Sequence, residues 1–369
     1  MNIKFIIKQY LKMGVQNIFL PAVYRIYCRK EINSNVVLFA DAHHTELPFS
    51  MRCLYEEMKK AGMCTEIMVS DYGKDSFPAN MKNMIHFMKV YANARCVVIC
   101  DNFLPVASCK KRPETTVIQL WHACGALKKF GYDTTEDIPS YYKGNVLKNC
   151  DYVTVSSKWC VPHFSSAMKL PKERFLASGI SRTDFYYRTD FLENVRSRFK
   201  KEYPQAQGKK VILWAPTFRG NAAMARVCGE EAVDDLAGRL DEGYYLIKSL
   251  HPHLMSKDEP KPGMTAEELL VVTDLLITDY SSILFDYLIF RRPLVLFAPD
   301  LDIYEKKRGF YMDYHSLPGT LVTDERELYS GVMKELKEYD LTKMEKTFDT
   351  YMGACDGHAT ERIMEKLLT

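Results

Sequence analysis

The stretch LLITDYSSILFDY, residues 275–287, decides the fold. Its first residues form an uninterrupted apolar run, which is typical of a strand buried on both faces of a parallel sheet. Polar residues follow at 278–282, and an apolar helical segment begins at 283. In open parallel sheets, ligands bind at the carboxyl ends of the strands. The stretch therefore predicts an α/β domain whose polar turn lies at a ligand-binding edge.

The same alternation of apolar run, polar turn and helical segment extends over the rest of the chain and predicts two Rossmann-like α/β domains facing a cleft. The charged stretch before residue 208 separates them, so we expect domains at 31–200 and 201–369. The runs expected to form strands are 35–44, 64–70, 95–101, 115–122, 152–157, 174–179, 211–218, 244–252, 274–282 and 293–299.

The composition excludes some classes of protein. The net charge is only +3 over 369 residues, which gives no support for a nucleic-acid-binding surface. The eleven cysteines show no CxxC pairs or regular spacing, which favours free thiols in a reducing compartment over a disulfide scaffold or a zinc site. No apolar run reaches the roughly 18 residues that a membrane-spanning helix needs.

The segment 1–30 is basic and amphipathic. Six lysines and arginines frame apolar residues such as Phe5, Ile6 and Phe19. Two interpretations stay open: a helix resting on an anionic membrane surface, or an ordinary N-terminal helix packed on the domain.

The polar turn at 278–282 contains Thr278, Asp279, Ser281 and Ser282. Two serines at a helix start favour binding of an anionic group such as phosphate, because their hydroxyls and the free amides of the first turn point the same way. An ordinary helix cap is the alternative interpretation.

Three further strand ends carry polar residues. Arg219 follows the strand at 211–218 and is either a phosphate contact or a surface residue. His251 precedes Pro252, which restricts its backbone to extended geometry. His122 follows the strand at 115–121; it is either a core histidine beside Trp121 or a base with a pKa suited to neutral pH.

Taken in order, eight short motifs resemble the CDP-glycerol glycerophosphotransferase family of teichoic acid synthesis over roughly residues 95–365. The run TDYSS, then FDY, then RGFY is the most specific part. The motifs are QLWHACGALKKFG (119–131), SGISRTD (178–184), WAPTFRG (214–220), LHP (250–252), TDYSSILFDY (278–287), RRPLVLFAPD (291–300), YEKKRGFYMDY (304–314) and DGHATERI (356–363).

The resemblance implies a GT-B-type architecture, with an acceptor-binding domain first and a nucleotide-binding domain second. It makes His122 the candidate catalytic base, while His251 assists the diphosphate of the donor. Ser281 and Ser282 would hold phosphate, and Arg219 is a further donor contact. Thr278, Asp279 and Arg308 are weaker assignments to the same CDP-polyol site.

The activity implied is transfer of glycerol phosphate, or a related polyol phosphate, from CDP-glycerol or CDP-ribitol to a hydroxyl of a lipid-linked saccharide or a growing polymer, with release of CMP. No protein-held metal is expected, although Mg²⁺ from solution could accompany the diphosphate. The sequence WHACG at 121–125 is more similar to primase-like members than the WHG-Thr-Pro of polymerases. A lipid-linked acceptor and segment 1–30 suit a peripheral enzyme at the cytoplasmic face of the membrane.

Two rival functions remain at the level of sequence. One is a glycosyltransferase of the same architecture that uses a CMP-sugar. The other is a non-catalytic protein that binds a nucleotide or a polymer. The FDY and RGFY motifs disfavour the first, and the presence of both His122 and His251 disfavours the second.

Overall fold

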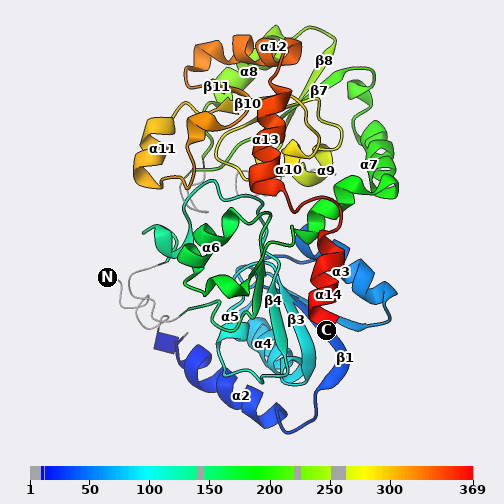
Figure 1. Ribbon diagram of the computed structural model, residues 1–369, viewed down its shortest axis with the longest axis vertical. Helices are drawn as coiled ribbons and strands as arrows, with labels where there is room; N and C mark the ends of the chain where they lie inside the picture. The colour runs from blue at the N-terminus through cyan, green and yellow to red at the C-terminus, as the bar shows by residue number, and fades with distance from the viewer. Residues whose placement is uncertain (1–9, 12, 139–144, 220–225, 251–262, 369) are drawn as a thin grey trace. The chain divides into compact units, whose positions relative to one another are not determined.

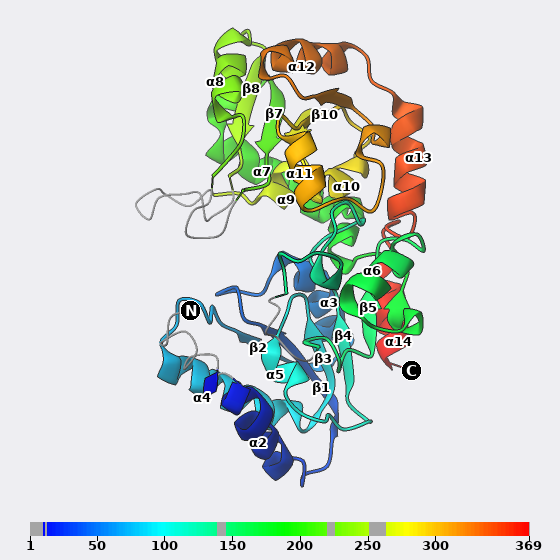
Figure 2. The same ribbon diagram turned by 90° about the vertical axis from the view of Figure 1, so that its left-hand side faces the viewer.

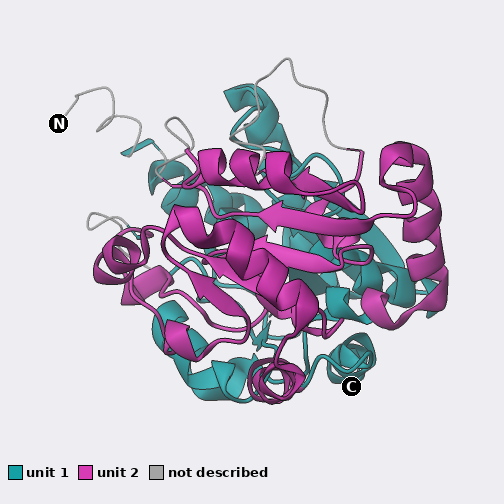
Figure 3. Cartoon of the chain, turned by 90° about the horizontal axis from the view of Figure 1, so that it is seen from above, with its two compact units in different colours: residues 1–122, 138–184, 354–369 teal, residues 123–137, 185–353 magenta. Residues whose placement is uncertain are grey.

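The computed structural model describes residues 10, 11, 13–138, 145–219, 226–250 and 263–368. The chain divides into two compact units, coloured separately in Figure 3. Unit 1 comprises residues 1–122, 138–184 and 354–369, and unit 2 comprises 123–137 and 185–353.

Unit 1 is built on a six-stranded parallel sheet in the order β2-β1-β3-β4-β5-β6. The strands are β1 (Asn33–Asp41), β2 (Cys64–Val69), β3 (Ala94–Ile99), β4 (Thr116–Gln119), β5 (Tyr152–Thr154) and β6 (Phe175–Leu176). The helices are α2 (Leu20–Tyr27), α3 (Phe49–Lys60), α4 (Phe77–Tyr91), α5 (Leu104–Ala107), α6 (Cys160–Met168) and α14 (Ala359–Leu368). Figure 1 shows this arrangement.

One face of the central strands of unit 1 packs against α3 and α14. Val37 and Phe39 of β1 lie in one core with Met51 and Leu54 of α3 and with Ile363 of α14. Figure 1 shows α14, the last helix of the chain, beside α3 on this face of the sheet. The C-terminal helix therefore completes the core of the unit in which the chain begins.

Unit 2 contains a five-stranded parallel sheet in the order β11-β10-β9-β7-β8. The strands are β7 (Lys210–Ala215), β8 (Tyr244–Lys248), β9 (Leu275–Thr278), β10 (Leu294–Phe297) and β11 (Thr320–Val322). The helices are α7 (Thr189–Glu202), α8 (Glu230–Arg239), α9 (Ala266–Leu269), α10 (Ile283–Leu288), α11 (Leu301–Lys307), α12 (Leu328–Lys337) and α13 (Leu341–Met352). Helices α8 and α12 pack with the strands in one apolar core.

The strand orders place one topological switch point in each sheet. The chain order reverses between β1 and β3 in unit 1 and between β7 and β9 in unit 2. At such a point the two adjacent connections leave on opposite faces of the sheet, and the carboxyl ends of the strands are open to a ligand. Each unit thus has one preferred place for a site.

Both parallel α/β sheets agree with the prediction from sequence, but the units divide the chain differently from the predicted boundary near residue 200. Unit 2 comprises residues 123–137 and 185–353, and residues 354–369 belong to unit 1. The charged stretch taken for the linker forms α7, whose Val195 and Phe199 are buried. The amphipathic face of α7 therefore packs within unit 2.

The described part of segment 1–30 packs on unit 1. Leu20 and Tyr24 of α2 are buried, and the ring of Tyr24 lies 5.0 Å from that of Tyr91 on α4. Figure 2 shows α2 alongside α4. Ile26 of α2 stays exposed, as does Ile18 before the helix, so α2 packs by one face and leaves an apolar side chain on another. Among the described residues, no helix combines the length and apolar character needed to cross a membrane.

All eleven cysteines are free, and most of them are buried. Burial raises the pKa of several thiols; the pKa values of Cys96, Cys109 and Cys150 rise to about 12. These cysteines act as small apolar residues of the core.

Candidate functional site

His122 lies beyond the carboxyl end of β4, the strand that pairs with β3. Its Nδ1 atom lies 3.3 Å from the carbonyl oxygen of Cys100 and 3.6 Å from Oδ2 of Asp101. Both of these residues follow β3 directly. Nearly half of the His122 side chain is exposed, at 47%. An imidazole with one nitrogen near a carboxylate and an open face has the arrangement of a general base.

The backbone next to His122 is held in an uncommon conformation. Trp121 has a φ of +59°, in the left-handed region that bulky residues rarely occupy. The amide of Trp121 donates to Oε1 of Gln119 at 3.0 Å, and Nε2 of Gln119 donates to the carbonyl oxygen of Asp101 at 3.0 Å. The Trp121 and His122 rings stack with centroids 4.6 Å apart. Gln119 therefore links the backbone of Trp121, next to His122, to the backbone of Asp101.

A second histidine–aspartate pair lies at the end of β1, on the other side of β3. Asp41 is 1% exposed and accepts hydrogen bonds from the amides of His43 and His44, at 2.7 and 2.9 Å. Nδ1 of His44 lies 2.8 Å from the same carboxylate oxygen. The hydrogen bond to Asp41 raises the pKa of His44. Burial alone would raise the pKa of Asp41, yet its hydrogen bonds outweigh burial and lower it.

In unit 2, the structure brings the predicted residues Arg219 and Asp279 into contact at the ends of β7 and β9. The guanidinium binds both carboxylate oxygens of Asp300, at 2.8 and 2.9 Å, and lies 2.9 Å from Oδ2 of Asp279. It also donates to the carbonyl oxygen of Thr217 at 2.6 Å and lies over the rings of Tyr280 and Tyr304.

The charge of Arg219 is therefore already balanced inside unit 2. Burial works against the charged form, but the hydrogen bonds and attraction to Asp300 and Asp279 outweigh it and raise the pKa of Arg219. Asp279 also accepts hydrogen bonds from the amides of Thr217 and Tyr280. This ion pair cluster joins the two strand ends at the switch point of the sheet.

Thr278, Ser281 and Ser282 follow or end β9. Thr278 is fully buried and its hydroxyl donates to the carbonyl oxygen of Ala215 on β7 at 2.7 Å, so it holds the two strands together. Ser281 and Ser282 are only partly buried, and the hydroxyl of Ser281 accepts from the amide of Ile283 at 3.4 Å. The serines are accessible to a ligand, whereas Thr278 is not. His251 lies outside the described residues.

Arg308 is engaged by a segment that is distant in sequence. Its guanidinium donates to both carboxylate oxygens of Asp137, each at 2.9 Å, and to the carbonyl oxygen of Lys129 at 3.0 Å. Residues 127–129 and 309–311 also exchange backbone hydrogen bonds. The RGFY motif thus holds residues 123–137 within unit 2 by hydrogen bonds. Donor binding by Arg308 stays a prediction.

The FDY motif, residues 285–287, also packs against segment 123–137. Gly125 has a φ of +64°, and a Cβ atom there would lie 2.4 Å from the ring of Phe285. The thiol of Cys124 lies 3.6 Å from Oδ1 of Asp286, which is buried. These motif residues are explained by packing of the segment that follows His122.

Lys128, which the prediction from sequence missed, brings a further cation to unit 2. Its backbone is bridged to Phe310. Burial, followed by the charge of Arg308, lowers the pKa of Lys128 to about 8, and the nearby Asp279 opposes this. In the described part of the chain, no hydrogen bond or ion pair engages its ammonium group. The sequence offered a weak signal, two lysines directly after the histidine motif.

Asp41, His44, Asp101 and Asp300 were also missed. Each follows or ends an apolar strand, as the residues that were selected do, so the same signal was present. The resemblance assigned them no role, and strand-end aspartates are common enough that the sequence alone did not separate them from helix and turn caps.

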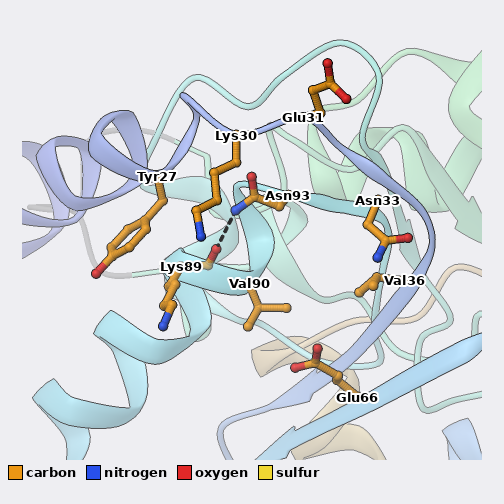
Figure 4. Close-up of a pocket in the computed structure, with 9 residues that line it drawn as sticks. All are labelled: Tyr27, Lys30, Glu31, Asn33, Val36, Glu66, Lys89, Val90 and Asn93. Carbon is orange, nitrogen blue, oxygen red and sulfur yellow. Dashed lines mark hydrogen bonds between the residues drawn. The ribbon is translucent and has the colours of Figure 1, made fainter.

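No group of three or more histidines, cysteines, aspartates or glutamates suited to a metal ion occurs among the described residues. Participation of Mg²⁺ with the donor therefore stays a prediction. A cavity of about 310 Å³ lies at the other end of β1, lined by Tyr27, Lys30, Asn33, Lys89 and Asn93 among others. Figure 4 shows this cavity, in which Asn93 donates to the carbonyl oxygen of Lys89; it contains none of the site residues.

Comparisons with known proteins agree with the fold and the motifs. The family model described as CDP-glycerol:poly(glycerophosphate) glycerophosphotransferase matches residues 22–369. The chain belongs to this family, so the resemblance drawn from its motifs is confirmed. It is thereby a glycerophosphotransferase-type enzyme, which removes the rival of a CMP-sugar glycosyltransferase.

The chain is similar to two teichoic acid primases. It is 30% identical to the teichoic acid ribitol-phosphate primase of Bacillus spizizenii W23, covering 97% of each chain. It is 29% identical to the teichoic acid glycerol-phosphate primase of Bacillus subtilis 168, covering 90% of this chain and 88% of the relative. A solved variant of the wall teichoic acid polymerase TagF shares the fold, with a TM-score of 0.75, 23% identity and coverage of 98% and 97%.

Proposed function

We propose that this enzyme transfers glycerol phosphate, or a related polyol phosphate such as ribitol phosphate, from the CDP-polyol to a hydroxyl of a lipid-linked saccharide or growing polymer. CMP is the second product. The observation that carries the proposal is the His122–Asp101 pair at the carboxyl edge of the unit 1 sheet. It supplies the base that an acceptor hydroxyl requires at neutral pH.

In the proposed step, the acceptor oxygen attacks the phosphorus that bears the polyol. The new bond is the phosphodiester of the product, and the bond that breaks joins this phosphorus to the oxygen bridging it to CMP. The hydroxyl proton passes to His122, and Asp101 stabilises the imidazolium that forms. CMP leaves with the electron pair of the broken bond, so cationic groups near the diphosphate lower the barrier.

We assign the donor to the switch point of unit 2. Ser281 and Ser282 offer accessible hydroxyls there, and Lys128 supplies a cation. Oγ1 of Thr217 is buried without a hydrogen-bond partner in the described part of the protein, so it can hydrogen-bond to the donor. Arg219 and Asp279 position this turn through their ion pair, and His251 assists the diphosphate.

Sequence and exposure bear on the identity and location of the acceptor. The sequence WHACG and the similarity to two primases support addition of the first polyol phosphate units to a lipid-linked saccharide. The exposed Leu11, Ile18 and Ile26, together with the basic residues of segment 1–30, support peripheral binding at the cytoplasmic face of the membrane.

The test is release of CMP by the purified full chain, offered CDP-glycerol, CDP-ribitol or a CMP-sugar with a lipid-linked disaccharide. We expect release from one CDP-polyol, dependent on the acceptor, with the polyol phosphate found on the acceptor by mass spectrometry. Transfer of a sugar from the CMP-sugar instead would contradict the proposal.

A further inference from the structure

The end of β1 carries an imidazole that the reaction described above does not use. His44 contacts the buried carboxylate of Asp41 through Nδ1, at 2.8 Å, and 52% of its side chain is exposed. Since Nδ1 faces the carboxylate, Nε2 is the nitrogen left to face solvent. When the ring is protonated, Nε2 is a charged hydrogen-bond donor.

His44 and His122 belong to one edge of the same sheet and are joined through β3. The thiol of Cys100 lies 3.7 Å from Oδ2 of Asp41, and the carbonyl oxygen of Cys100 lies 3.3 Å from Nδ1 of His122. β1 and β4 flank β3, and adjacent strands lie about 4.8 Å apart, so the two strand ends are separated by about 10 Å. β1 and β3 also form the switch point of unit 1, where ligands bind in such sheets.

The surroundings of His44 favour its charged form. The carboxylates that act on it are Asp41, Asp101 and Asp71, and its hydrogen bond to Asp41 has the largest effect on its pKa, which is raised. Asp71 is itself paired with Lys74 at 2.9 Å, and Asp41 is satisfied by two amides. A histidine whose protonated form is favoured is a poor base but a good donor to an anion.

We propose that His44 binds a phosphate group of the acceptor and thereby places the acceptor hydroxyl beside His122. The inference rests on the proposed function, since an acceptor built of polyol phosphates or carried on a lipid diphosphate has a phosphate near its reactive end. The residue acts in binding, and His122 remains the base.

Steady-state kinetics of CMP release test the proposal with His44→Gln and the matched control His43→Gln. His43 is the exposed neighbour, and no hydrogen bond to its ring occurs among the described residues. We expect His44→Gln to raise the KM for the acceptor about tenfold, the loss typical of one charge-assisted hydrogen bond, with kcat and the KM for the CDP-polyol within about twofold. His43→Gln should match the wild type.

The pH dependence separates binding from a merely structural role. In the wild type the acceptor KM should rise as pH increases through the raised pKa of His44, because the imidazolium is lost. His44→Lys should restore a low KM that is constant from about pH 6 to 8, since an ammonium stays charged over that range. A fall in kcat with unchanged KM would instead make His44 a base, and a raised KM for the CDP-polyol would assign it to the donor; either result overturns the proposal.

A binding measurement keeps this inference separate from the proposed function. Histidine-labelled full chain is titrated with glycerol 3-phosphate and, in parallel, with glycerol, and the ring signal of His44 is identified by its loss in His44→Gln. We expect a saturable shift and a further rise in the pKa of His44 with glycerol 3-phosphate alone. No shift overturns the inference even if CMP release is found. A shift in a protein that releases no CMP supports the phosphate site and contradicts the proposed function.

Discussion

His122 and Asp101 owe their proximity to the register of two neighbouring strands. Ile99 of β3 pairs with Gln119 of β4, so residues two and three positions further along meet at the same edge. The sequence predicted the histidine from its place after an apolar run. It did not predict the aspartate, because which strands are neighbours depends on the sheet order, which alternation along the chain does not specify.

At the residue scale, we expect Asp101→Asn to lower kcat for CMP release by about tenfold to a hundredfold, because the amide cannot stabilise the imidazolium of His122. Nδ1 of His122 and Oδ2 of Asp101 lie 3.6 Å apart, so we expect a smaller fall in kcat than for a tightly hydrogen-bonded pair. The exposed Asp302→Asn serves as the control. Equal rates for Asp101→Asn and wild type would show that His122 works without this carboxylate.

Arg219→Met tests the ion pair cluster of unit 2. The substitution leaves Asp279 and Asp300 with no partner for their charge, and losing one member of a buried pair costs about 3–5 kcal/mol of folding free energy. Because Asp300 is one-fifth exposed, we expect the lower end, about 3 kcal/mol, by urea unfolding. Arg326→Met, at a fully exposed pair, should change little. A loss below about 1 kcal/mol would mean that Arg219 is not part of the folding core.

At the scale of elements, the segment 123–137 shows what motif matching leaves unexplained. The motifs after His122, at FDY and at RGFY are far apart in sequence, and among them the resemblance gave a chemical role only to Arg308. In the structure they contact one another through Gly125, Phe285 and the backbone of 127–129 and 309–311. Their common pattern reflects packing, which a single sequence does not reveal.

Gly125→Ala measures that packing. The new Cβ would require a strained backbone and would overlap the ring of Phe285, so we expect a loss of about 2–4 kcal/mol in the free energy of unfolding. Gly208→Ala is matched to it, since Gly208 has a φ of +76° with no atom within 4 Å of the new Cβ. Gly208→Ala should lower the free energy of unfolding by only about 1 kcal/mol. Equal losses of unfolding free energy in Gly125→Ala and Gly208→Ala would show that Phe285 does not stabilise segment 123–137.

A double-mutant cycle with Asp137 tests whether Arg308 stabilises segment 123–137 or binds the donor. If the pair fastens the segment, Arg308→Ala and Asp137→Asn each lower stability and the effects are less than additive. We expect this result by urea unfolding, with the KM for the CDP-polyol similar in both variants. A raised donor KM in Arg308→Ala alone would show instead the direct donor contact that the resemblance implies.

At the scale of the whole molecule, the sequence predicted two parallel α/β sheets but not which segments complete each unit. The apolar runs are long enough to identify strands, whereas the amphipathic pattern of α14 is compatible with packing on either sheet. The chain returns to unit 1 at residue 354, where Asp184 accepts hydrogen bonds from the amides of Ala359 and Thr360. These contacts depend on residues some 175 positions apart.

Ile363→Ala tests the contribution of that returning helix. Ile363 is fully buried among β1, β3 and α3 residues, so the cavity should cost about 2–4 kcal/mol. Loss of tertiary structure in unit 1 is followed through hydrogen exchange of β1 and β3, and the partly exposed Leu368→Ala is the control. Unchanged exchange in these strands would contradict the packing of α14 as described.

The most direct measurement is single-turnover release of CMP from the preferred CDP-polyol and acceptor by wild type, His122→Ala and the exposed control His86→Ala. We expect His122→Ala to fold normally and to release CMP at least about a hundredfold more slowly, while His86→Ala retains the wild-type rate. A folded His122→Ala protein that releases CMP at the wild-type rate would contradict the assignment of the acceptor base to this edge of unit 1.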